Sequence, residues 1–341
     1  MKIALDATYS LGRNLSGVGV YSREILKGLA EAHPEVRFQA CYRTHRFFRS
    51  FQDSLPGNAS RTLLWEGRTP GADLFHGLNQ RIASTRHKRT VSTFHDLFVM
   101  TGEYSTREFR ERFAGQAREA AERSDVIIAV SAFTALQVEE LLKVERARIR
   151  VIHHGARVPR GSVLPREQLI LSVGALQARK NTTRLVAAFE QTAPGWKLAL
   201  AGSSGFGAEE ILAEIRGSRR SSDIQILGYV SDDALEDLYA RASIFAFPSL
   251  DEGFGMPLLD AMARGVPILT SNVSALPEVA GDAALLVDPR DVGSIAGGLH
   301  SLMESEGLRA QLAERGQKRV QGFSWRAAAA ATWNVYRELI R

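Results

Sequence analysis

The chain has 341 residues, about twice the length of a typical single domain, so we expect two domains. Apolar residues make up 45% of the chain and charged residues 24%, which excludes a wholly disordered protein. The single cysteine, Cys41, excludes a disulfide framework and a cysteine-rich metal site. No apolar run approaches the roughly 20 residues of a membrane span, and the first residues lack the apolar region of a signal peptide. We therefore expect a cytoplasmic protein.

The net charge of +5 is distributed unevenly along the chain. Residues 1–160 hold 25 Lys and Arg against 17 Asp and Glu, whereas residues 161–341 hold 18 against 21. A solvated basic face is the simpler interpretation. The alternative is that the first half meets an anionic partner, such as a membrane surface or a phosphate-bearing substrate. Nucleic acid is not expected, because the sequence has neither zinc-finger spacing nor an RNA-binding signature.

Short apolar segments alternate with helical patterns through the first half of the chain. The predicted strands cover residues 2–7, 37–42, 61–64, 73–76, 90–94 and 125–130. The predicted helices cover residues 19–32, 105–123 and 132–142, the last with Ser131 as its N-cap. Uniformly apolar strands that alternate with helices predict a mostly parallel α/β sheet covered on both faces.

The second half of the chain repeats the alternation. Its predicted strands cover residues 169–173, 196–201, 224–227, 244–247, 267–270 and 285–287, and its predicted helices 182–191, 209–216, 232–240 and 257–264. A polar stretch with Pro159, Gly161 and Pro165 fits a linker, so we place the domain boundary near residue 160. Two doubly wound, Rossmann-like domains follow. Ligands of such sheets bind beyond the carboxyl ends of the strands, so the loops there are the candidate sites.

Two features of the first half lie in such loops. Gly17 and Gly19 stand between the first strand and the first helix, where glycines let backbone N–H groups approach an anion. The third glycine of a dinucleotide-binding motif is replaced by Ser22, so NAD is not predicted, and a flexible loop is the alternative. His95 directly follows the strand 90–94, and its imidazole can donate to a developing charge or hold a hydroxyl.

The other histidines compete with His95 for this role. His76 follows its own strand in the same way, and a structural role is the alternative for either residue. The pair His153 and His154 has no third ligand at metal spacing, so we interpret it as structural or ligand-lining and predict no metal site.

Two segments of the second half carry cations or exposed backbone. Residues 174–181 bring Arg179 and Lys180 to the start of the next predicted helix, an arrangement suited to a diphosphate. The loop is not a Walker motif, and a solvated basic loop is the alternative. Gly228 and Tyr229 follow a later strand, where backbone groups can pair with a flat heterocycle unless they form a plain turn.

An acidic segment at residues 251–260 is the most informative part of the sequence. Glu252 and Asp260 are separated by seven residues, and carboxylates accept hydrogens from sugar or ribose hydroxyls. Pro257 opens a helix whose start carries the N–H groups of Phe254, Gly255 and Met256, next to Gly253. A glycosidase carboxylate pair is the rival interpretation, disfavoured because Arg179 and Lys180 have no role in hydrolysing a neutral glycoside.

The order of these motifs resembles retaining glycosyltransferases of family 4, which have the GT-B fold of two Rossmann-like domains facing across a cleft. The resemblance runs from Gly17-Val18-Gly19 through His95-Asp96 and Arg179-Lys180-Asn181 to the acidic segment and Leu276-Pro277-Glu278-Val279. The acidic segment resembles the family's E-x7-E motif, with Asp260 in place of the second glutamate. The segment Phe323-Ser324-Trp325 and the helix up to Ile340 also resemble the family, in which the last helix packs back on the first domain.

The resemblance implies a division of labour. It implies an acceptor-side domain over residues 1–160, a nucleotide-sugar-binding domain over 161–322 and a returning helix over 323–341. His95 would contact the donor sugar, Arg179 and Lys180 would neutralise the diphosphate, and Glu252 would hold sugar hydroxyls. Further donor contacts are implied for Gly17, Gly19, Gly228, Tyr229, Gly253, Phe254, Gly255, Met256 and Asp260, the last with the ribose.

The implied activity is transfer of a sugar, with retention of configuration, from a nucleotide-diphosphate-sugar to a saccharide or lipid-linked acceptor. A GDP-mannose-like donor is favoured over a UDP-sugar, and surface-polysaccharide assembly is the implied process. The donor is a co-substrate, so no cofactor is expected, and the absence of a D-x-D triplet agrees with metal-independent catalysis. The alternatives are a UDP-sugar epimerase, a phosphorylase and a non-catalytic nucleotide-sugar-binding protein on the same fold.

Residues 42–51 interleave aromatic and basic side chains. We favour a short helix whose Phe47, Phe48 and Phe51 pack inward. The alternative hypothesis is a peripheral, salt-sensitive contact with an anionic membrane, at its inner face, or with a lipid-diphosphate acceptor.

Overall fold

The structure, a computed structural model, describes residues 1–12, 15–65, 70–83, 85, 87–160 and 164–340. The chain forms two compact units: unit 1 comprises Met1–Gly155 with Ser324–Arg341, and unit 2 comprises Ala156–Phe323. The change of unit after Gly155 lies five residues before the expected boundary at residue 160. Gly161 of the expected linker lies outside the described residues.

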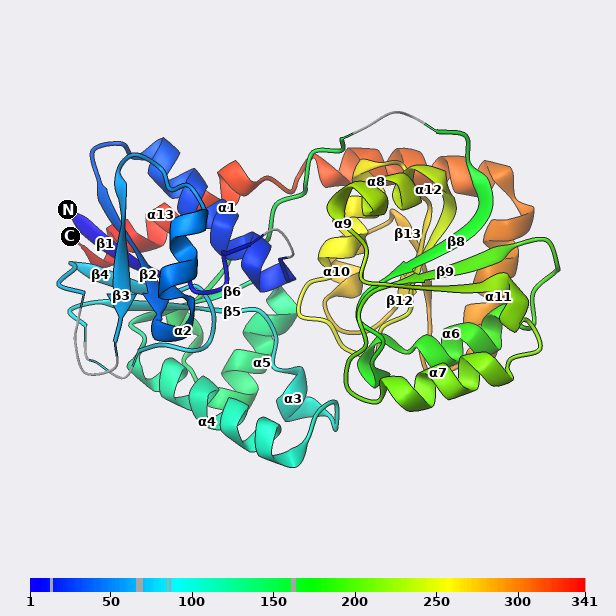
Figure 1. The fold of residues 1–341 in the computed structure, drawn as a ribbon, viewed down its shortest axis with the longest axis horizontal. Coiled ribbons are helices and arrows are strands. Elements are labelled where there is room, and N and C mark those ends of the chain that lie inside the picture. The colour runs from blue at the N-terminus through cyan, green and yellow to red at the C-terminus, as the bar shows by residue number, and fades with distance from the viewer. Residues whose placement is uncertain (13–14, 66–69, 84, 86, 161–163, 341) are drawn as a thin grey trace. The chain divides into compact units, whose positions relative to one another are not determined.

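Unit 1 is built on a parallel sheet with the order β3-β2-β1-β4-β5-β6-β7 within its described residues (Figure 1). The strands are β1 (Lys2–Asp6), β2 (Arg37–Arg43), β3 (Ala59–Leu64), β4 (Leu74–Gly77), β5 (Thr90–Phe94), β6 (Val126–Ala129) and β7 (Ile149–Val151). Ile3 of β1 pairs with Phe38 of β2 and with Leu74 of β4. The strand order therefore reverses direction at β1 and β4.

Helices cover both faces of this sheet, as expected for buried parallel strands. They are α1 (Gly17–Ala32), α2 (Thr44–Phe47), α3 (Phe98–Thr101), α4 (Arg107–Arg123), α5 (Ala132–Leu142) and α13 (Trp325–Leu339), with 3₁₀ turns η1 (Phe48–Gln52) and η2 (Arg146–Arg148). One core cluster joins the sheet to α1 and α13, and another joins its opposite face to α4 and α5. Ser131 caps α5 by accepting from the N–H of Thr134, which confirms the predicted cap.

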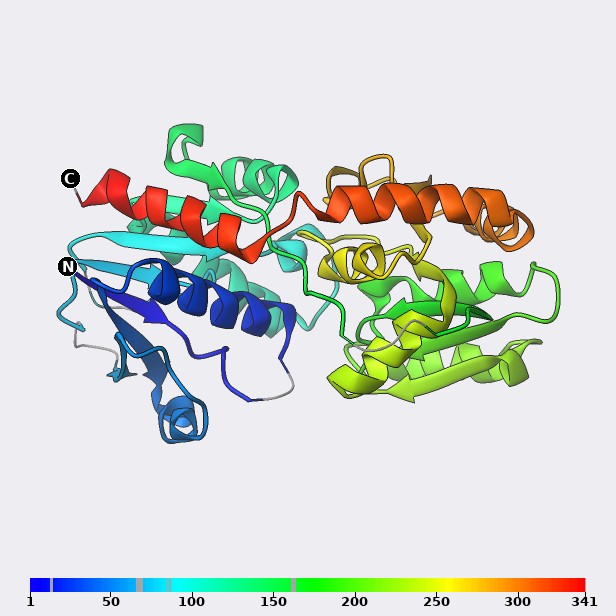
Figure 2. The ribbon, with the colours of Figure 1, turned by 90° about the horizontal axis from the view of Figure 1, so that it is seen from above.

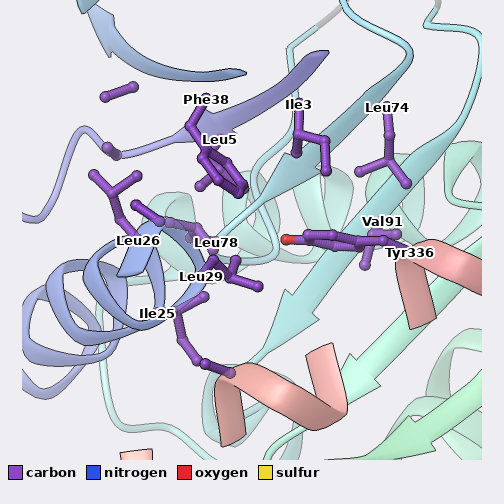
Figure 3. Packing of buried hydrophobic residues seen from close by; sticks show 14 of the residues in the cluster. Ile3, Leu5, Ile25, Leu26, Leu29, Phe38, Leu74, Leu78, Val91 and Tyr336 are labelled. Carbon is purple, nitrogen blue, oxygen red and sulfur yellow. The ribbon is translucent and has the colours of Figure 1, made fainter. Parts of the chain in front are cut away.

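The C-terminal helix α13 is part of unit 1, as the sequence resemblance implied, and packs beside α1 (Figure 2). The contact is close, because a Cβ added at Gly28 of α1 would lie 2.9 Å from Cβ of Ala329. Tyr336 of α13 enters the core near Val91 and Leu74 (Figure 3). Its hydroxyl oxygen lies 2.5 Å from Nδ1 of His76, so a buried hydrogen bond anchors the helix to the sheet.

The segment after β2 differs from the favoured expectation. Phe47 packs against the core, but Phe48 is 81% exposed and Phe51 is 62% exposed. The chain changes from α2 to the tighter turn of η1 at this point, so the side chains three residues apart share an outer face while Ser50 faces inward. The inward packing predicted for Phe48 and Phe51 is therefore wrong.

Unit 2 contains a second parallel sheet with the order β10-β9-β8-β11-β12-β13 within its described residues. The strands are β8 (Glu167–Val173), β9 (Lys197–Ala201), β10 (Ile224–Gly228), β11 (Ala242–Phe247), β12 (Ile268–Ser271) and β13 (Ala284–Val287). The helices are α6 (Thr182–Phe189), α7 (Ala208–Gly217), α8 (Asp232–Arg241), α9 (Met256–Ala263), α10 (Leu276–Ala280), α11 (Val292–Glu304) and α12 (Glu306–Val320), with η3 (Ala178–Lys180) and η4 (Ser221–Asp223).

One core cluster of unit 2 joins the sheet to α6, α7 and α11, and Figure 1 shows α8 and α9 on the opposite face. The strand order reverses between β8 and β11, so the loops after these two strands leave the same edge side by side. Within the described residues, no helix combines the length and the apolar character needed to cross a membrane.

Candidate active site

The candidate site of unit 2 lies where the strand order reverses, the place where open α/β sheets bind their ligands. Residues 174–181 follow β8, and residues 248–255 follow β11. The N–H of Leu250 donates to the carbonyl of Arg179 at 2.8 Å, so the two loops are joined through their backbones. The topology thus brings together the two segments that the sequence singled out separately.

Asn181 holds this pair of loops in place. It adopts a left-handed conformation with φ of 60°, which asparagine tolerates better than most residues. Its amide nitrogen donates to the carbonyl of Pro248 at 2.9 Å and to that of Pro289 at 2.7 Å. Asn181 had no predicted role; its position between two cations and the start of a helix is the signal that could have marked it.

The charged centre of the site is a buried cluster of one carboxylate and two cations. Nη1 of Arg179 lies 2.8 Å from Oε2 of Glu252, and Nζ of Lys180 lies 2.6 Å from Oε1 of the same carboxylate. Nη1 of Arg179 also donates to the carbonyl of Asp251 at 2.6 Å. The Lys180 ammonium lies 4.6 Å from the ring centroid of Phe247, the last residue of β11.

The two cations of this cluster keep the carboxylate of Glu252 ionised. Burial by itself raises the pKa of Glu252, but the charges and hydrogen bonds of Arg179 and Lys180 outweigh it and lower the pKa to about 2. Glu252 is therefore ionised at neutral pH. Arg179 and Lys180 thus bring two cations to one point of the site.

The start of α9 lies directly beyond Glu252. Gly255 is its N-cap with φ of +98°, and a Cβ there would lie 2.8 Å from Cδ2 of Leu276, so only glycine fits without strain. The carbonyl of Glu252 accepts from the N–H of Ala275 at 3.2 Å, which fixes the carboxylate's backbone. The N–H groups of Phe254, Gly255 and Met256 thus lie at a helix start beside the cluster, following Gly253.

Asp260 lies further along the same helix, α9, in a different environment. Burial raises its pKa to about 6, although Arg157 and Arg264 act in the opposite direction. Nη1 of Arg264 lies 3.9 Å from Oδ1 of Asp260 and donates to its carbonyl at 2.8 Å, while the same guanidinium binds Glu236. The carboxylate of Asp260 is therefore only weakly paired.

Gly228 and Tyr229 differ in the groups that they can present to a ligand. Gly228 has φ of +63°, and its carbonyl accepts from the N–H of Gly202 at 2.8 Å. This bond uses the carbonyl of Gly228, one of the backbone groups that were predicted to pair with a heterocycle. Tyr229 is more than half exposed and can still present its ring.

In unit 1, His95 follows β5 and is buried. Its Nε2 lies 2.9 Å from the carbonyl of Leu78, so Nε2 must carry the proton. Burial lowers the pKa of His95 to about 4, against the raising effect of that hydrogen bond. At neutral pH the ring is therefore uncharged, with Nδ1 as an acceptor. It suits a hydroxyl group better than a developing negative charge.

The competing histidines are structural. His76 lies in a buried chain of hydrogen bonds, with Nδ1 on Tyr336 and Nε2 on Thr93 at 2.8 Å, and burial lowers its pKa to about 3. His154 is buried and its ring stacks 5.4 Å from that of His95. His76 therefore holds the last helix through Tyr336, and His154 packs against the ring of His95.

Gly17 and Gly19 do not form the expected loop. Helix α1 begins at Gly17, with Ser16 as its N-cap, so both glycines belong to the first helical turn. Gly17 is exposed, whereas a Cβ at Gly19 would lie 2.7 Å from the carbonyl oxygen of Tyr9. Gly19 is thus needed for close packing of the loop after β1.

Comparison with known proteins agrees with this architecture. Residues 15–158 match the family model described as Glycosyltransferase Family 4, and residues 160–319 match Glycosyl transferases group 1. The O-antigen chain mannosyltransferase B of Escherichia coli is 30% identical over 99% of this chain and 100% of its own length. The serotype-specific mannosyltransferase WbdA of Escherichia coli is 30% identical over 70% of this chain but only 32% of its own length.

Solved structures show the same fold. Sucrose-phosphate synthase from Thermosynechococcus elongatus superimposes with a TM-score of 0.82 at 22% identity, over 99% of this chain and 98% of that one. WaaG, a glycosyltransferase involved in lipopolysaccharide biosynthesis, gives a TM-score of 0.74 at 15% identity, over 98% and 99%. The two Rossmann-like units with parallel sheets thus define a glycosyltransferase of the GT-B class. Within that class, the chain belongs to glycosyltransferase family 4.

Proposed function

We propose that this glycosyltransferase moves a mannosyl group from GDP-mannose to a saccharide or lipid-linked acceptor, with retention of configuration, in the assembly of a surface polysaccharide. The cluster of Arg179, Lys180 and Glu252 carries the proposal, because it places two cations where a diphosphate would leave. The names of the two Escherichia coli mannosyltransferases support mannose as the sugar. A UDP-sugar is the alternative donor.

The charge distribution suggests how the reaction proceeds. Cleavage of the bond between sugar and phosphate leaves negative charge on the diphosphate and an oxocarbenium-like sugar. Arg179 and Lys180, with the N–H groups at the start of α9, would stabilise the leaving group. Glu252 would accept hydrogens from sugar hydroxyls, and uncharged His95 would hold another hydroxyl through Nδ1. The leaving phosphate oxygen would take the proton of the acceptor hydroxyl, so that the proton balance closes without a separate base.

Metal-independent catalysis is part of the same proposal. Two protein cations already supply the positive charge that Mg²⁺ gives to a diphosphate in other transferases. The sequence also contains no D-x-D triplet. We therefore assign the electrostatic role to Arg179 and Lys180.

We further propose that unit 1 contacts an anionic membrane, at its inner face, through residues 44–52 and Trp65. Phe48 and Phe51 are exposed on η1, and Trp65, which directly follows β3, is 61% exposed. Trp65 lies at the same sheet end, because its predecessor Leu64 pairs with Arg43, directly before α2. Exposed rings beside Arg46 and Arg49 suit an interface with anionic headgroups.

Liposome co-sedimentation at low and high salt tests the membrane contact. Arg43 is not a useful target, because it is buried and its Nη2 lies 3.2 Å from Oδ2 of Asp6. The double variant Arg46→Gln/Arg49→Gln should lose binding, whereas the exposed Arg326→Gln should retain it. Wild-type protein that stays in the supernatant with anionic liposomes at low salt would show that unit 1 does not bind membranes.

A thermal-shift screen against GDP-, UDP-, ADP- and dTDP-sugars tests the donor. Ligand at about 100 times its Kd adds roughly 2.7 kcal/mol to the free energy of unfolding, so the preferred donor should stand out. GDP-mannose should give the largest shift. Turnover assays then separate the alternatives: an epimerase would consume its donor without an acceptor, and a binding protein would not consume it at all.

A further inference from the structure

The donor loop, residues 252–256 at the start of α9, is supported on one side by α10. The N–H of Ala275 donates to the carbonyl of Glu252 at 3.2 Å, and a Cβ added at Gly255 would lie 2.8 Å from Cδ2 of Leu276 on α10. Helix α10 has five residues, and a helix of that length is not stable by itself. Its position therefore depends on the contacts that hold its other end.

Arg319 of α12 holds that end of α10. Its Nε donates to the carbonyl of Val279 at 2.9 Å, and its Nη2 donates to the carbonyl of Glu278 at 2.6 Å. The last carbonyls of a helix have no partner within the helix, and the planar fork of a guanidinium can bind two of them at once. The side chain also lies against the backbone of Gly281, where an added Cβ would lie 2.8 Å from Nε. Arg319 thus caps α10.

The same guanidinium reaches the other side of the donor loop through two aromatic rings. Its Cζ lies 5.6 Å from the ring centroid of Phe323, within the range of a cation–π contact. Phe323 is buried and packs edge-on against Phe254 of the donor loop, with the ring centroids 6.0 Å apart. Its carbonyl accepts from the N–H of Ala156 at 3.1 Å. The donor loop is therefore supported by α10 and by Phe323, and Arg319 joins the two supports.

We infer that Arg319 and Phe323 are positioning residues for sugar transfer, which hold the donor loop so that the N–H groups at the start of α9 stay aimed at the leaving diphosphate. They act through Phe254 and α10 rather than on the reacting atoms. Backbone donors stabilise a transition state when their orientation is set before the charge develops. Loss of the support should therefore lower kcat more than it lowers the affinity for a diphosphate. The role in transfer rests on the proposed function, whereas the support of the loop does not.

Hydrogen exchange of the protein without ligand tests the support of the loop directly. Arg319→Gln should speed exchange of the Ala275 N–H at least fivefold, because this group is bound to Glu252. The N–H groups of β9, inside the sheet, should exchange at an unchanged rate. Arg315→Gln, on the same helix and beside Asp282, is the matched control and should leave Ala275 unchanged. Unchanged exchange of Ala275 in Arg319→Gln, or equal acceleration in β9 or in the control, would overturn the inference.

Kinetics then test the role in transfer, with the nucleotide sugar that the thermal-shift screen selects. Arg319→Gln and Phe323→Leu should each lower kcat at least tenfold and change the Kd of the matching nucleoside diphosphate less than threefold. Arg319→Lys keeps the charge but loses the planar fork, so its kcat should fall between those of the wild type and Arg319→Gln.

The double variant Arg319→Gln/Phe323→Leu should have a kcat within about twofold of the slower single variant, because both residues support one loop. A near-normal kcat in both single variants, or losses that multiply in the double variant, would overturn the positioning role. Failure of every nucleotide sugar to be turned over by the wild type would refute the proposed function and leave the exchange result standing.

Discussion

The ammonium of Lys180 lies 2.6 Å from the carboxylate of Glu252, a residue 72 positions later in the sequence. Arg179 binds the other carboxylate oxygen, so Glu252 neutralises part of the charge that we assign to a diphosphate. An arriving diphosphate must therefore share these cations with Glu252. In the proposed mechanism Glu252 therefore has two opposite effects: it would compete with the phosphate groups, and it would hold the sugar that is transferred.

Replacement of Glu252 by Gln should reduce mannosyl transfer at least 100-fold. The amide keeps the shape but loses the charge that orients sugar hydroxyls and stabilises an oxocarbenium-like sugar, and loss of one such preorganised group typically costs about 3–4 kcal/mol. Initial rates with GDP-mannose measure the effect. Glu214→Gln, at an exposed position of α7, is the matched control and should transfer normally. A folded Glu252→Gln variant with a near-normal rate would remove Glu252 from the mechanism.

Replacement of Lys180 by Ala should nearly abolish transfer, because a single cation then remains for both Glu252 and the leaving diphosphate. The exposed Lys197→Ala on β9 changes the same residue type outside the site and should have little effect. Rates at saturating GDP-mannose separate loss of catalysis from loss of binding. Comparable rates in the two variants would show that Lys180 does not stabilise the leaving group.

Transfer should survive EDTA. In the proposed mechanism Arg179 and Lys180 provide the charge that a divalent cation would otherwise supply at the diphosphate. Rates are measured before and after chelation, with added Mg²⁺ or Mn²⁺ as the control arm. Activity that disappears with EDTA and returns with either metal would show that the protein cations do not suffice.

Asp260 should make the free energy of unfolding depend on pH. Its folded-state pKa of about 6 lies above the roughly 3.9 of an unfolded aspartate, so its favourable contribution is complete below about pH 3.9 and is lost as the pH rises through 6. Asp260→Asn should remove this loss. The substitution should raise the free energy of unfolding more at pH 7.5 than at pH 4.5, by at most about 3 kcal/mol. Urea unfolding at the two pH values measures it. An equal effect of the substitution at both would contradict the raised pKa.

Tyr336→Phe should destabilise unit 1 by about 1–3 kcal/mol, because it leaves a buried ring nitrogen of His76 without its partner. Tyr229→Phe removes an exposed hydroxyl and should change the free energy of unfolding by less than about 0.5 kcal/mol. Equal unfolding midpoints for the two variants would mean that the buried hydrogen bond does not anchor α13.

Much of the fold could be predicted from the sequence because parallel strands are buried on both faces and leave continuous apolar runs. The strand 90–94 matches β5 residue for residue. Strand β7 was missed because it has three residues with Arg150 in the middle, and α11 and α12 were not assigned at all. The outward turn of Phe48 and Phe51 was missed because a change from α to 3₁₀ geometry alters which positions share a face.

The candidate site was predictable in parts. Strand alternation placed Arg179, Lys180 and Glu252 in loops at the same edge of a sheet, but the sharing of one carboxylate by both cations depends on strand order and on Asn181. A cavity of about 480 Å³ in unit 1 was marked only in part, because Ser16 and Val18 line it beside Gly17 and Gly19, whereas its other lining residues belong to no predicted motif.

The most direct test is the affinity of GDP for the wild type, Lys180→Ala and Glu252→Gln, measured by isothermal titration. GDP carries the diphosphate without the sugar, so only the competing effect of Glu252 remains. Lys180→Ala should weaken GDP binding at least tenfold, whereas Glu252→Gln should strengthen it, because the carboxylate no longer occupies the two cations. The same affinity in all three proteins, or weaker binding in Glu252→Gln, would contradict the assignment of this cluster to the diphosphate.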